Sequence, residues 1–164
     1  YLPVEEWLFF IVIPFSCLFI YESVKYFHDV KKYNETVRRF YLLLGAILIL
    51  AGSINYEKSY TFWNFIFCGL FLLYSGYKVR DYHAEFFVAY LYSLIPFFIV
   101  NGILTDGNFD YNHFTDPVVW YNNDENLFIR IITIPFEDLF YSMLLLLMNV
   151  TFYEKFMSNS IKNN

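Results

Sequence analysis

The sequence predicts an all-α fold, a polytopic membrane helix bundle with about five transmembrane helices. Its composition is one reason: 58% of the 164 residues are hydrophobic, 24% are aromatic and only 16% are charged, whereas about 25% of the residues of soluble domains are charged. The other is a set of five apolar segments, each near the ~20 residues that cross a bilayer. They cover residues 3–22, 40–56, 61–77, 84–104 and 131–153. Because no low-complexity linker divides them, we treat residues 1–164 as a single domain.

Basic residues are concentrated on one side of these segments. Residues 23–39 and 78–85 and the C-terminus hold most of them: Lys25, Lys31, Lys32, Arg38, Arg39, Lys78, Arg80, Lys155 and Lys162. Cytoplasmic loops of membrane proteins carry such an excess. We therefore expect a multi-pass protein of the cell membrane, with loops 23–39 and 78–85 and the C-terminus in the cytoplasm. The net charge of −5 gives no basic surface for nucleic acid.

The first and last apolar segments resemble each other. Residues 2–22 read LPVEEWLFFIVIPFSCLFIYE and residues 134–154 read IPFEDLFYSMLLLLMNVTFYE. An offset of 132 residues superposes their ends, and it places Pro3, Glu5, Glu6, Tyr21 and Glu22 on Pro135, Glu137, Asp138, Tyr153 and Glu154. The sequence therefore predicts a parallel internal repeat, with each proline in the first turn of its helix, where a missing N–H costs nothing.

Each repeat carries two adjacent acids at its start. Acids in an apolar segment are usually functional, and neighbouring carboxylates in a water-poor site favour holding a proton between them. One pair is then a candidate general acid, and the other a candidate base or cation stabiliser. Helical periodicity predicts that Asp138 and Glu6 face the bundle interior. The alternative is that the acids only cap helices at the membrane interface.

Other residues give little sign of a cofactor. His28, His83 and His113 lack the spacing of metal ligands, and DGNFD at residues 106–110 is a weak substitute for a diphosphate-binding DDxxD motif. Neither GxGxxG nor a P-loop occurs, so no cofactor is evident. We expect loop 105–127 to be either an ordered outer lid or an unstructured connector, with Trp120 and Tyr121 at the interface. Arg130 is expected to pair with an acid or to extend toward the interface.

Two stretches carry a family resemblance. They are LPVEEWLFF at the start and VVWYNNDENLFIRIITIPFEDLFYSMLLLLMNVTFYE near the end, with NGILT at residues 101–105. These resemble the membrane-embedded lycopene cyclase family, whose members occur as two-subunit enzymes, single fused chains and domains fused to phytoene synthase. The fused members have further membrane helices before the first acidic motif, so we expect this chain to lack N-terminal helices. By the resemblance, the acidic motifs correspond to Glu5, Glu6, Glu137 and Asp138.

The resemblance implies a lycopene β-cyclase. In that reaction an acid protonates the terminal double bond of a linear C40 carotenoid, the next alkene closes a six-membered ring, and loss of a proton gives a β-ionone end. Aromatic faces stabilise cations, and the candidates for this role are Trp7, Phe9, Phe10, Phe140 and Tyr141. The expected partners are lycopene or a related carotenoid, membrane lipid, and a second subunit in a homo- or hetero-oligomer. A membrane prenyltransferase and a non-catalytic carotenoid-binding or assembly subunit are the alternatives.

Overall fold

The computed structural model describes residues 4–78, 81–105, 119 and 121–162, without the side chains of residues 4–6, 9–10 and 159–162. It is mostly helical, which confirms the predicted all-α class. The long helices are α1 (Val4–Phe27), α2 (Asn34–Ile54), α3 (Ser59–Tyr77), α4 (His83–Leu104) and α5 (Glu137–Lys162). The short elements are the 3₁₀ helices η1 (Lys31–Tyr33) and η2 (Asn123–Glu125) and the strands β1 (Arg130–Ile131) and β2 (Ile134–Pro135).

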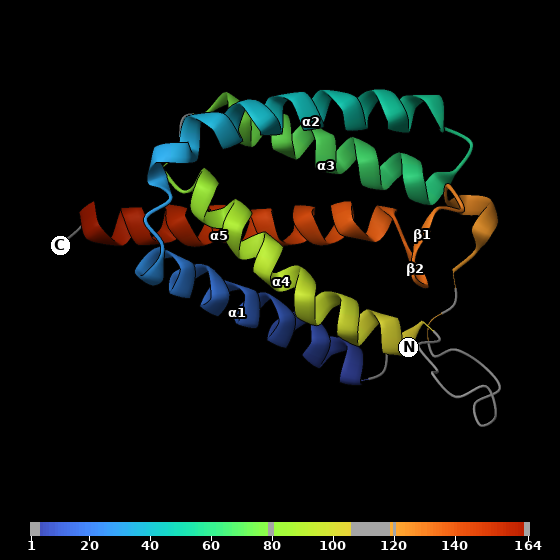
Figure 1. The fold of residues 1–164 in the computed structure, drawn as a ribbon, viewed down its shortest axis with the longest axis horizontal. Helices are drawn as coiled ribbons and strands as arrows, with labels where there is room; N and C mark the ends of the chain where they lie inside the picture. Colours follow the sequence, from blue (N-terminus) through green and yellow to red (C-terminus); the bar gives the residue numbers. More distant parts are fainter. Residues whose placement is uncertain (1–3, 79–80, 106–118, 120, 163–164) are drawn as a thin grey trace.

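The helices form a bundle with α5 in the middle (Figure 1). Helices α2 and α3 lie antiparallel on one side of α5 and α1 lies on the other, while α4 crosses α5 obliquely (Figure 1). Helices α1 and α5 run in the same direction, so their first turns lie at one end of the bundle (Figure 1). The strands β1 and β2 form an antiparallel hairpin just before α5, at this same end.

Glycines bring α2 and α3 into close contact. A Cβ added at Gly45 would lie 2.9 Å from the backbone oxygen of Gly69, and one added at Gly69 would lie 2.8 Å from the oxygen of Gly45. A Cβ added at Gly52 would lie 3.2 Å from Cβ of Phe65, and one added at Gly76 would lie 3.0 Å from the side chain of Leu42. Small residues at such contacts are typical of helix pairs in membranes, because they allow close backbone approach.

Two segments, Lys31–Ile54 and His83–Leu104, are long and apolar enough to cross a membrane by length and hydropathy. Membrane crossing by α1, α3 and α5 remains a prediction, as does the internal repeat. Many large apolar side chains on the outer faces of the helices are exposed, among them Phe15, Phe19, Leu43, Ile47, Leu91 and Ile95. Such a surface is suited to lipid contact.

The predicted start of the fifth segment is wrong. Residues 131–136 are not helical: Ile131 pairs with Ile134 and Arg130 with Pro135 across the hairpin, and α5 begins only at Glu137. Pro135 therefore lies in a strand and not in the first turn of a helix. A proline fits here because a two-residue edge strand does not need its missing N–H.

Candidate functional site

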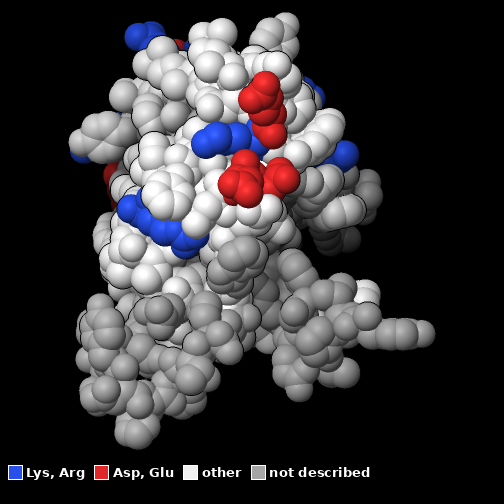
Figure 2. Space-filling view, turned by 90° about the vertical axis from the view of Figure 1, so that its right-hand side faces the viewer, with Lys and Arg blue, Asp and Glu red and all other residues white. Residues whose placement is uncertain are grey.

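The acids Glu137 and Asp138 open α5, at the end of the molecule that Figure 2 turns toward the viewer. There the charged side chains gather in a few clusters separated by uncharged surface (Figure 2). Both acids are buried, since Glu137 is 0% exposed and Asp138 is 7% exposed. The prediction that Asp138 faces inward is confirmed. The helical periodicity singled out only Asp138 of this pair, whereas the structure buries both acids. Glu137 is buried too, and Thr61 of α3 and Leu127 of the segment before α5 both bond to its carboxylate.

Two donors hold one oxygen of Glu137. The Thr61 hydroxyl donates to Oε1 at 2.6 Å, and the backbone N–H of Leu127 donates to the same atom at 2.7 Å. The Asn64 amide donates to the backbone oxygen of Glu137 at 2.7 Å. The second carboxyl oxygen, Oε2, is buried and has no hydrogen-bond partner among the described residues. A buried polar atom is seldom left so, and because Oε1 already accepts two donors, Oε2 is the oxygen of this carboxyl that is open to a further partner.

Two phenols hold Asp138. Tyr60 of α3 donates to Oδ1, and Tyr121 donates to Oδ2 at 2.5 Å. Burial, and then the hydrogen bond to Asp138, raise the pKa of Tyr121, so this phenol keeps the proton that it donates. Each carboxyl oxygen of Asp138 thus accepts one O–H group.

A groove with a volume of about 480 Å³ lies beside the acids. It runs along α3 and α5, and its walls include Tyr60, Trp63, Asn64, Phe67, Tyr141 and Leu144. The rings of Trp63 and Phe67 stack at 5.4 Å. Tyr60 and Asn64 line the groove and also bond to Asp138 and Glu137, so these two side chains connect the buried acids to an apolar, aromatic surface.

The structure separates the aromatic residues predicted to stabilise a cation. Tyr141 lines the groove. Phe140 packs edge-on between Phe65 and Phe136, with centroids 5.3 and 5.1 Å away, so its contacts are those of a core residue. Trp7 is 61% exposed on α1. The side chains of Glu5, Glu6, Phe9 and Phe10 lie outside the described residues.

Sequence reasoning missed the side chains that bond to the acids. Tyr60, Thr61 and Asn64 of α3 were not predicted as site residues, although a threonine and an asparagine three positions apart in an apolar segment are a usable signal. Tyr121 bonds to Asp138, a contact that was not predicted, while its expected place at the membrane interface stays a prediction.

Arg130 was expected to pair with an acid or to reach toward the interface. It bonds to Asn123 and to the backbone oxygen of Thr133, with its guanidinium 5.8 Å from the centroid of Tyr121. No ion pair of Arg130 with an acid is found among the described residues, and its reach toward the interface stays a prediction. Within the described residues, no group of three His, Cys, Asp or Glu side chains could hold a metal ion.

Comparison with known proteins identifies the family of this chain. No curated protein and no solved structure matches the chain. A family model described as "Lycopene cyclase" matches residues 1–24 and 57–156. The matched residues contain both acidic pairs, all of α3 and α4, and the hairpin, whereas α2 falls in the unmatched stretch. The match covers most of the sequence, so the chain belongs to the lycopene cyclase family, and a carotenoid cyclase is the role that this membership supports.

Proposed function

We propose that this protein is a lycopene β-cyclase, which closes the linear ends of lycopene into β-ionone rings by acid-initiated, redox-neutral chemistry in the membrane. The observation that carries the proposal is the buried pair Glu137 and Asp138, joined through Tyr60 and Asn64 to an aromatic groove. Family membership supplies the substrate class.

The proposed reaction needs a proton donor, a proton acceptor and an apolar surface. A proton adds to the terminal double bond and leaves a carbocation, and the next alkene attacks it to form the ring C–C bond. Loss of a ring proton restores neutrality and gives the β-ring, so no oxidant or reductant is consumed. An aromatic groove suits this sequence because it binds a polyene end and its π faces stabilise the cation.

We assign different roles to the two acids. Glu137 is the proton donor in this proposal, because Oε2 is the one carboxyl oxygen of the pair without a donor among the described residues. Asp138 is the counter-charge, because two phenols donate to it. The rings of Tyr60, Trp63, Phe67 and Tyr141 face the groove as cation-stabilising groups. Glu5 and Glu6, which match the family's first acidic motif, would accept the ring proton.

Pigment analysis tests the proposal. The protein is expressed in cells that accumulate lycopene, and the extracted carotenoids are separated by chromatography. We expect β-ring products from the wild type and a loss of roughly 100-fold or more from Glu137→Gln and from Asp138→Asn, the scale of general acid–base catalysis. Glu57→Gln and Asp124→Asn serve as controls, because Glu57 and Asp124 are exposed.

The outcomes also separate the alternative functions. Lycopene recovered unchanged from membranes that contain the wild-type protein would contradict a cyclase and favour a carotenoid-binding or assembly subunit. Turnover that needs Mg²⁺ and a diphosphate substrate would favour a prenyltransferase. Cyclic products at wild-type level from both acid variants would reject the assigned roles. Because family members also occur as two-subunit enzymes, a homo- or hetero-oligomer is part of the proposal, and co-purification of a second subunit tests it.

A further inference from the structure

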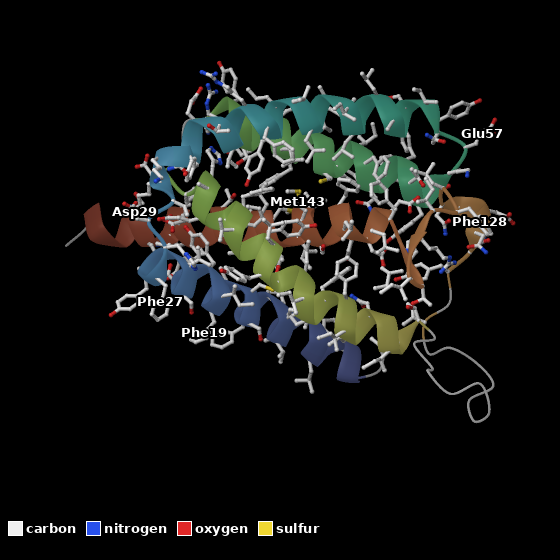
Figure 3. All side chains as sticks on the ribbon, viewed as in Figure 1. Phe19, Phe27, Asp29, Glu57, Phe128 and Met143 are labelled. Carbon is white, nitrogen blue, oxygen red and sulfur yellow. The ribbon has the colours of Figure 1, made fainter. Side chains whose placement is uncertain are left out.

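Three large apolar side chains project from the hairpin that precedes α5. Phe128 is 68% exposed, Ile129 is 54% exposed and Ile132 is 78% exposed. We call these three residues the hairpin tip. Figure 3 places Phe128 at the end of the bundle where α5 begins, well away from the core residue Met143. The proposed reaction uses none of the three side chains.

The backbone is strained at two of these three residues. Phe128 and Ile132 both have φ near +62°, a region that bulky and β-branched residues rarely occupy. Hydrogen bonds hold the hairpin in place: Phe128 N donates to Asn126 Oδ1 at 2.8 Å, and Phe136 N donates to the oxygen of Ile129 at 2.9 Å. Strain of this kind persists where the surrounding structure enforces it, and it is frequent at functional sites.

The hairpin lies at the level where two candidate membrane spans end. The hydroxyl of Thr133 is 2.6 Å from that of Thr105, which caps the C-terminal end of α4. Helix α2 ends at the same end of the bundle (Figure 1). Both α2 and α4 belong to segments able to cross a membrane. The hairpin tip therefore lies at the level where both segments end, and at a membrane interface exposed aromatic and aliphatic side chains beside a basic one such as Arg130 are favoured.

We propose that the hairpin tip inserts into the membrane interface and that its partner is lipid. Lipid contact offsets both the exposure and the backbone strain of the three side chains. The tip also adjoins the acid site, because Leu127, next to Phe128, donates its N–H to Glu137 at 2.7 Å. Insertion would thus anchor the segment that holds Glu137 at a fixed depth in the bilayer.

A fluorescent probe at Ile132 tests this. Ile132→Cys is made in the full chain with Cys17 and Cys68 replaced by alanine, labelled with bimane, and reconstituted into vesicles of phosphatidylcholine and phosphatidylglycerol. Some of the vesicles contain lipids with a nitroxide near the headgroup end of the acyl chain. We expect a blue-shifted emission and several-fold stronger quenching by the nitroxide lipid than for the same probe at Asp124→Cys. Asp124 is exposed on η2, before the hairpin.

Two results would overturn the proposal. Equal quenching of both probes by aqueous iodide, without quenching by the nitroxide lipid, would mean that the tip remains in water. A probe at Ile132→Cys that is shielded from both quenchers would mean that a protein surface, such as a second copy of the chain, covers the tip. The parent without an introduced cysteine gives the background signal. None of these readouts depends on cyclase activity.

Discussion

The phenol pair at Asp138 gives the sharpest test of the site. Tyr60→Phe and Tyr121→Phe each remove one O–H and leave one oxygen of a buried carboxylate without its donor. A hydrogen bond to a charged group contributes about 1.5–3 kcal/mol. Each substitution should therefore lower the free energy of unfolding by about this amount. Tyr56→Phe is the matched control, because Tyr56 is 67% exposed and its loss should change the free energy by less than about 0.5 kcal/mol.

A double-mutant cycle separates the bond from other effects of the ring. Unfolding of the purified protein in detergent is followed by circular dichroism, with each tyrosine variant made in the wild type and in the Asp138→Asn background. Residues in one hydrogen-bond network couple by about 0.5–3 kcal/mol, so the tyrosine variants should cost less in that background. The reasoning is refuted if Tyr60→Phe and Tyr121→Phe behave like the control, or if their cost is the same in both backgrounds. Pigment assays should show the larger loss for Tyr60→Phe, because Tyr60 also lines the groove.

Three further predictions concern the scaffold. Gly69→Ala places a Cβ 2.8 Å from a backbone oxygen of α2 and should destabilise the protein by about 1–3 kcal/mol. At Gly102 an added Cβ meets nothing within 4 Å, so Gly102→Ala should be neutral or stabilising by up to about 1 kcal/mol. Thermal unfolding of the two variants tests this difference. Arg38 donates to Glu35 at 2.7 and 2.8 Å, and the arginine that follows it donates at 3.1 Å. Because salt screens exposed ion pairs, Glu35→Gln should lower the melting temperature slightly at low salt and less at high salt, and a difference that does not change with salt would contradict this. Asparagine tolerates a positive φ better than isoleucine does. Ile132→Asn should therefore raise the free energy of unfolding in detergent by about 1 kcal/mol, and a decrease would show that the strain is absent.

Helix positions followed from the sequence where an apolar run ends at a polar turn. The predicted segment 61–77 matches α3 (Ser59–Tyr77), and the segment 84–104 matches α4 (His83–Leu104). The run IRIITIPF before α5 misled the prediction, because periodicity alone does not distinguish a short apolar hairpin from the start of a helix. The signal that was available is Pro135, whose missing N–H suits an edge strand as well as a first helical turn.

The acids of the site could be predicted from the sequence, but their hydrogen-bond partners could not. The acids of α5 stood out because charge is costly in an apolar segment, and helical periodicity placed Asp138 inward. Their partners could not be found in the same way, because Thr61 and Tyr60 lie more than 70 residues away in sequence and meet the acids only through packing of α3 against α5. Tyr121 lies closer, but its contact depends on the hairpin, which the sequence did not reveal.

The far end of the bundle bears on how the two acidic motifs relate. There the Tyr21 hydroxyl donates to Glu154 at 2.6 Å, and Lys25 bridges Glu22 and Glu154 at 3.0 and 2.9 Å, so α1 and α5 are joined near their C-terminal ends. From this junction back to Glu5, and likewise back to Glu137, the helix rises about 24 Å. Because α1 and α5 run in the same direction (Figure 1), the junction sets both acidic motifs at nearly the same depth, and both helix dipoles present their positive ends there. The two motifs thus reach the same end of the bundle from different helices, as the proposed division into a proton donor and a proton acceptor requires.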